Sequence, residues 1–169
     1  NAGIIAPSLR TAGNWVMNGT LTPGGGTVYF DGGVAQTIQG TTTFFNLEIA
    51  NNAGVSVTNG MTYVRGGLNL DQGAITTNDK LTIKSDALGT GWVDNFSAGM
   101  NGTIVGDIIM QRFFPADAIS TAFHYIGSPV NSPSVAANLS ELALYGPDGA
   151  QLIPTPDCNP NGLIHYSPY

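Results

Sequence analysis

Short apolar strands recur about every 20 residues through the first half of the chain, in three interleaved series. The first series lies at residues 28–30, 47–49 and 68–70, the second at 36–38, 55–57 and 75–77, and the third at 43–45, 62–64 and 81–83. Three short strands per period are typical of a three-sided parallel β-solenoid, because one coil cannot bury its own apolar face and must share a core with its neighbours. We therefore predict an all-β fold, a right-handed three-sided parallel β-solenoid (β-helix).

Within each strand, apolar and polar side chains alternate, as Val55, Ser56 and Val57 show. Such period-two patterning sends one set of side chains into the core and the other set outward. Glycines separate the strands at the same interval, for example Gly40 and Gly60. Glycine supplies the backbone freedom that a sharp corner between two faces requires. The pattern therefore predicts inward aliphatic and aromatic side chains, outward Ser, Asn, Thr and Glu, and glycine at the corners.

The regular pattern is clearest over residues 14–88, and the period is lost from Gly89 onward. We therefore divide the chain into β-solenoid coils at residues 1–88 and an irregular β-rich module at residues 89–169. The module is expected either to cap the solenoid or to continue it, since an uncapped coil would leave its apolar side open.

Three segments outside the regular pattern also have strand character. Residues 4–5 fit the last strand of a preceding coil. Residues 102–114 have the pattern of one long strand, and residues 123–130 that of another. The chain opens without Met, and we expect it to be a piece of a longer polypeptide.

Composition and charge exclude two kinds of partner. Only 9% of the 169 residues are charged, and the five cations leave a net charge of −6. So few cations neutralise few phosphates, which argues against a nucleic-acid partner. No apolar run approaches the roughly 20 residues that span a bilayer, so we expect no membrane insertion. For the single cysteine, Cys158, we leave two interpretations open: a partner beyond this segment, or an unpaired thiol with no role.

Because β-helices include polysaccharide-cleaving enzymes, we searched for paired carboxylates. Glycoside hydrolysis needs two of them about 5–9.5 Å apart, and stacked strands lie about 4.8 Å apart. One period after Glu48 stands Asn69, and one period after Asp31 stand residues 50–52. Neither alignment makes a pair, so we expect no catalytic residues and no enzyme.

Other candidate chemistry is weighed in the same way. Arg65 and Lys84 are 19 residues apart and would stack on neighbouring coils, either as the substrate clamp of a lyase or, as we favour, as two solvated outward cations. His124 and His165 lack neighbours at metal-ligand spacing. Ser128 does not match a Gly-x-Ser-x-Gly nucleophile elbow. We therefore expect no metal and no cofactor.

Aromatic residues suggest a carbohydrate-binding strip, with core packing as the alternative. The candidates are Tyr29, Phe44, Phe45 and Tyr63. Phe45 precedes Val64 by one period of 19 residues, which fits an inward stack. We therefore favour core packing over a ligand-binding strip.

Part of the chain resembles a known family. Residues 24–49 contain GGGTVYFDG, AQTIQG and TFFNLEI in succession, which is similar to repeats of large secreted surface proteins of Bacteroidota. Residues 106–115 and 123–130 resemble a module that often follows those repeats, although His124-Tyr125 stands where an aromatic–arginine pair is common. The resemblance covers about residues 14–130.

This resemblance implies an adhesin-like protein that is secreted or displayed on the cell surface. Such proteins are commonly exported by the type IX secretion system, so its outer-membrane machinery is the partner expected during export. Our leading hypothesis is a non-catalytic stalk or spacer segment. The first alternative is a module that binds a surface glycan or protein through residues 89–169, and the second is a β-helix polysaccharide lyase or hydrolase.

Overall fold

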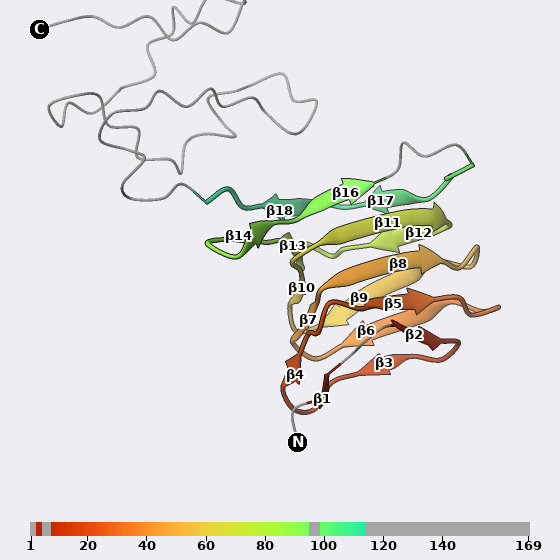
Figure 1. Cartoon of the computed structure of the whole chain (residues 1–169). Coiled ribbons are helices and arrows are strands. Elements are labelled where there is room, and N and C mark those ends of the chain that lie inside the picture. The colour runs from red at the N-terminus through yellow and green to blue at the C-terminus, as the bar shows by residue number, and fades with distance from the viewer. Residues whose placement is uncertain (1–2, 5–7, 95–98, 114–169) are drawn as a thin grey trace, which may run out of the picture. The chain divides into compact units, whose positions relative to one another are not determined.

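The computed structural model describes residues 3–4, 8–94 and 99–113, and every regular element in them is a β-strand. Strands far apart in the sequence lie one above another in parallel, as Figure 1 shows. The predicted all-β parallel β-solenoid is confirmed, with three parallel sheets and about four turns.

Each sheet forms one face of the solenoid. The first face comprises β2 (Ser8–Thr11), β5 (Thr27–Phe30), β8 (Asn46–Ala50), β11 (Gly67–Gln72) and β16 (Trp92–Asp94). The second face comprises β3 (Trp15–Val16), β6 (Gln36–Gln39), β9 (Val55–Asn59), β12 (Ala74–Thr76) and β17 (Thr103–Val105). The third face comprises β7 (Thr42–Phe44), β10 (Thr62–Val64), β13 (Leu81–Ile83) and β18 (Ile108–Met110). The chain therefore visits the three faces in turn and stacks one coil on the last.

The first two predicted series are paired as the period requires. On the first face Val28 pairs with Leu47, which pairs with Leu68. On the second face Val55 lies between Gln36 and Ile75. A residue and its counterpart one period later are therefore hydrogen-bonded neighbours.

The third series was predicted one residue out of register, and the inward stack of Phe45 on Val64 is wrong. Val64 pairs with Phe44, not with Phe45. Phe44 is 1% exposed in the core, whereas Phe45 is 39% exposed. The physical reason is that β7 ends at Phe44, so Phe45 already lies in the corner that leads to β8.

The core is continuous through the middle coils, which we define as strands β5 to β13. All their buried hydrophobic side chains are at most 2% exposed. They are Val28, Phe30, Ile38, Phe44, Leu47, Ile49, Val55, Val57, Val64, Leu68, Leu70, Ile75, Leu81 and Ile83. Each such burial contributes roughly 1.5–3 kcal/mol before the cost of ordering the chain. Trp15 closes the core below, with its ring 5.2 Å from that of Phe44.

Tight corners depend on glycine where coils approach closely. Gly73 has a φ of 77°, and Gly40 has a φ of 82°. A Cβ atom at Gly73 would overlap the carbonyl oxygen of Asn51, and one at Gly40 would overlap that of Met17. Both the left-handed backbone and the contact with the coil below therefore require glycine.

A buried polar network fixes the corner between the first and second faces. The Gln36 side chain, 1% exposed, donates to the carbonyl oxygens of Thr11 (2.9 Å) and Gly13 (2.6 Å). Its oxygen accepts from the Gly32 amide (3.0 Å) and from the Asn51 side chain (2.9 Å). One side chain thus satisfies polar groups of consecutive coils that water does not reach.

The solenoid extends beyond residues 14–88 in both directions. Before them, β1 (Gly3–Ile4) pairs with β4 (Leu21–Thr22), and β2 pairs with β5. After them, β16, β17 and β18 pair in parallel with β11, β12 and β13. Of the two arrangements expected for the module after residue 88, its described part therefore continues the coils.

The single long strand predicted at residues 102–114 is wrong. Gly106, with a φ of 94°, separates β17 from β18, which belong to different faces. The period seemed lost because this coil is longer: Leu68 pairs with Val93, and Ile75 pairs with Ile104. The predicted strand at 123–130 lies outside the described residues.

Candidate functional site

A shallow groove of about 370 Å³ follows the corner between the third and first faces. Its lining comes from the corners of consecutive coils: Pro23, Gly24, Gly25, Phe45, Arg65, Leu88 and Gly89. Arg65 stands one coil after Phe45, because Val64 pairs with Phe44 and the Gly66 amide donates to the Phe45 carbonyl at 2.7 Å. The groove therefore runs along the direction in which the coils stack.

An inserted hairpin makes one wall of this groove. Strands β14 (Ser85–Asp86) and β15 (Gly89–Thr90) pair in antiparallel fashion between β13 and β16. Leu88 lies at the turn of this hairpin and is 83% exposed. Because the lower corners lack such an insertion, the hairpin projects beyond them and gives the groove its depth.

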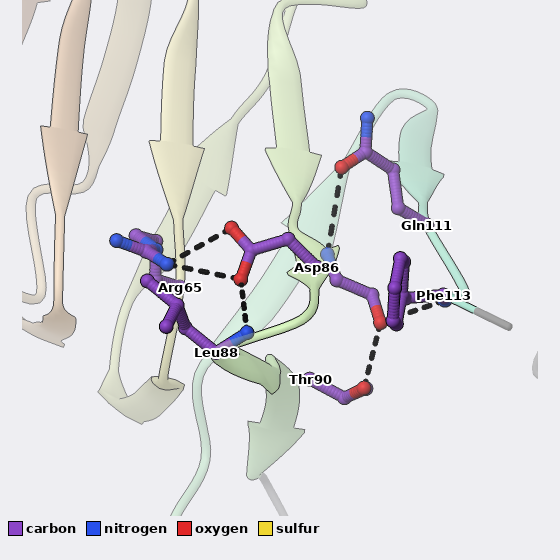
Figure 2. Close-up of polar contacts among 7 residues, drawn as sticks. Arg65, Asp86, Leu88, Thr90, Gln111 and Phe113 are labelled. Carbon is purple, nitrogen blue, oxygen red and sulfur yellow. Dashed lines mark hydrogen bonds and ion pairs between the residues drawn. The ribbon is translucent and has the colours of Figure 1, made fainter. Parts of the chain in front are cut away.

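An ion pair fixes the hairpin to the coil below it, as Figure 2 shows. Nη2 of Arg65 donates to both carboxylate oxygens of Asp86, at 3.0 and 2.9 Å. The Leu88 amide donates to the same carboxylate at 2.9 Å. That amide, and then the Arg65 guanidinium, hold the pKa of Asp86 below its ordinary value of 3.8.

The base of the hairpin is held from the coil above. The Phe113 amide donates to Ser85 Oγ at 2.9 Å, and Ser85 Oγ lies 2.6 Å from the Thr90 hydroxyl (Figure 2). The Ser85 amide donates to the Gln111 side chain at 3.4 Å. Hydrogen bonds on both sides therefore position Asp86 and Leu88.

The expectation of two solvated cations holds for neither residue. Register places Lys84 beside Arg65 on the next coil, as predicted. However, Arg65 forms the ion pair with Asp86, and the Lys84 ammonium lies 5.3 Å from the centroid of the Tyr63 ring. The Asp86 partner was missed because the hairpin insertion moves it out of the 19-residue period.

A second polar feature is a ladder on the outer side of the first face. Arg10, Tyr29, Glu48, Asn69 and Asp94 occupy one register position in five successive strands. Arg10 lies 4.5 Å above the Tyr29 ring. Burial raises the pKa of Glu48, although its hydrogen bond with Asn69 opposes that shift.

This ladder confirms the predicted alignment of Glu48 with Asn69 and adds one carboxylate that the sequence analysis missed. Asp94 lies one step beyond Asn69, because the last coil is longer than the others. Two ladder steps from Glu48 to Asp94 correspond to roughly 10 Å. Asp31, predicted to align with residues 50–52, instead forms an ion pair with Arg10 at 2.8 Å.

The four aromatic candidates do not form one strip. Phe44 is in the core, and Phe45 lines the corner groove. Tyr29 lies on the first face and Tyr63 on the third. Trp92, which the sequence analysis did not single out, is 53% exposed on the first face.

The remaining sequence candidates, Ser128, His124, His165 and Cys158, lie outside the described residues. In the part of the chain that the structure describes, no three His, Cys, Asp or Glu side chains gather to hold a metal ion. Nor does this part contain a helix long and apolar enough to cross a membrane. Compared with protein-family models, with curated proteins and with solved structures, the chain matches none.

Proposed function

We propose that this chain is a structural stalk or spacer segment of a secreted, cell-surface, adhesin-like repeat protein, without catalytic activity. One observation carries the proposal. Consecutive coils share a single core and pair in register, so every coil buries the same positions as the one below it. Such a scaffold gains length by adding coils while each new coil contacts only its neighbours.

The geometry suits a spacer for a second reason. Each coil adds about 4.8 Å along the stack, and the hydrogen bonds between coils run in that same direction. Stability therefore grows with the number of coils rather than with the closure of one compact core. Export by type IX secretion, and display on the surface, rest on the resemblance of residues 24–49 to repeats of Bacteroidota surface proteins.

Duplication of one complete coil tests the spacer function. A chain in which residues 28–46 occur twice in tandem supplies one additional strand to each face. We expect it to fold, to keep its β circular dichroism signal and to be at least as resistant to denaturant as the original chain. An unfolded or aggregated product would contradict a modular spacer.

Two alternatives remain candidates. Recognition of a surface glycan is favoured by one feature, the corner groove with its arginine and exposed phenylalanine. Cleavage of polysaccharides ranks last. Incubation of the chain with acidic polysaccharides, followed by ultraviolet absorbance, tests the lyase reaction directly, since a lyase would release unsaturated products.

A further inference from the structure

We propose that the corner groove binds a linear, neutral oligosaccharide. This inference goes beyond the spacer function and does not depend on it. The groove takes residues from the corners of four successive coils, which gives it an elongated form along the stack. Its volume of about 370 Å³ falls within the range of small-molecule sites, about 300–1,000 Å³.

Charge at the groove favours a neutral ligand. Arg65 is the only charged side chain among the described residues that line it, and Asp86 neutralises that charge at 2.9 Å. An anionic ligand would meet the Asp86 carboxylate beside the guanidinium. Hydroxyl groups suit this pair better, because each both donates and accepts a hydrogen bond.

The ion pair leaves donors for such a ligand. Its two hydrogen bonds both use Nη2 of Arg65, and a guanidinium carries five N–H donors on three nitrogens. The Arg65 side chain is 27% exposed. The carboxylate, which has capacity for about four hydrogen bonds, supplies the acceptor.

Apolar surface lies on both sides of the ion pair. Phe45 is 39% exposed and Leu88 is 83% exposed, and both line the groove together with Pro23. Sugar rings combine polar edges with apolar C–H faces. Side chains such as these cover the C–H faces while Arg65 and Asp86 bond the hydroxyls.

The groove is also largely preformed. Arg65 is held by Asp86, and the hairpin is held by Ser85 with Phe113 and Thr90 (Figure 2). Binding to a fixed arrangement saves the free energy of ordering side chains and loops.

Isothermal titration calorimetry on the complete chain tests the proposal. The probes are four neutral hexasaccharides (cellohexaose, maltohexaose, xylohexaose and mannohexaose), with hexagalacturonate as the acidic comparison. We expect saturable binding of at least one neutral probe, and tighter binding of it than of hexagalacturonate. Absence of binding to all four would overturn the proposal, and preferential binding of hexagalacturonate would replace it with an anion site.

Three variants localise the binding. We expect Phe45→Ala and Leu88→Ser each to weaken binding by about tenfold or more, as loss of a central contact does. Leu88→Ser leaves the Arg65–Asp86 pair in place, so it remains informative if changes near the pair impair folding. Val34→Ser is the matched control, because Val34 is 69% exposed at a corner and does not line the groove. Equal affinity of all three variants and the original chain would show that the sugar binds elsewhere and would overturn the assignment.

Discussion

The middle coils and the last described coil have the same architecture but differ in packing. In the middle coils, strands recur at 19 to 21 residues and the inward side chains are at most 2% exposed. In the last coil, β16 to β18, the equivalent side chains Val93, Ile104, Ile108 and Met110 pack against the core but are only partly buried. Hydrophobic residues on its outer side, such as Trp92 and Ile109, are more than half exposed.

This difference shows where the stability of the fold comes from. An inward side chain is fully buried when coils lie both above and below it, and half of that burial comes from a neighbour. The same sequence pattern is therefore worth less in the last described coil than in the middle. Stability should fall from the centre toward that coil, although the strand pairing is parallel in both.

The largest expected difference is between two isoleucines that pair with each other. Ile75 in β12 is fully buried, and Ile104 in β17, its register partner, is partly buried. Ile75→Ala should cost about 2–5 kcal/mol. Ile104→Ala should cost less than about half as much, since the free energy follows the apolar area removed from water. Urea unfolding of both variants measures this; equal costs would show that the two coils are packed alike.

Corner glycines should show a smaller contrast. Gly73 and Gly99 both have positive φ, 77° and 98°. Alanine at either position incurs about 1–2 kcal/mol of backbone strain, but only at Gly73 does its Cβ also meet the coil below, at the Asn51 carbonyl. Gly73→Ala should therefore lower the unfolding midpoint clearly more than Gly99→Ala. The comparison by thermal unfolding would fail if both variants were shifted equally.

Two glutamines compare buried with exposed hydrogen bonds. Gln36→Ala should cost about 1–3 kcal/mol, because it leaves the buried groups around it, such as the Gly32 amide, without partners. Gln111→Ala in the last coil should change stability by less than about 0.5 kcal/mol, because its bond to the Ser85 amide is exposed. Hydrogen exchange at Gly32 should accelerate in the first variant only. Unchanged exchange at Gly32 in the Gln36 variant would contradict the network.

The smallest contrast concerns pH. Burial raises the pKa of Glu48 above 4.5, so the charged form disfavours folding and its protonation stabilises the fold as pH falls toward 4.5. The pKa of Asp86 lies below 3.8, so its contribution is present above pH 3.8 and is lost as pH falls further. Glu48→Gln should therefore raise the melting temperature slightly at pH 7 and have no effect near pH 3, whereas Asp86→Asn should lower it at pH 7. Melting curves between pH 3 and 7 check both signs.

The fold was predictable because its period is a direct consequence of packing. Val28, Leu47 and Leu68 stand at equal spacing and do pair. The register of Phe44 and Phe45 was not predictable, since two adjacent phenylalanines fit the inward position equally well. The last coil was missed because its corner contains an inserted hairpin, which lengthens the period between Leu68 and Val93.

The site was less predictable than the fold. Asp86 falls outside the 19-residue period, so no spacing linked it to Arg65. Gln36, by contrast, carried a signal: it stands where Val55 and Ile75 stand in the next two coils. A polar side chain at an inward position indicates a buried hydrogen-bond network, because an unpaired polar group there would be costly.

Nuclear Overhauser contacts between coils test the central claim, the parallel stacking in register, most directly. In the methyl-labelled chain we predict contacts from Val28 to Leu47 and from Leu47 to Leu68, together with backbone contacts in the parallel pattern between β6 and β9. Antiparallel contacts between strands that follow one another in the sequence, such as β5 with β6, would contradict the solenoid.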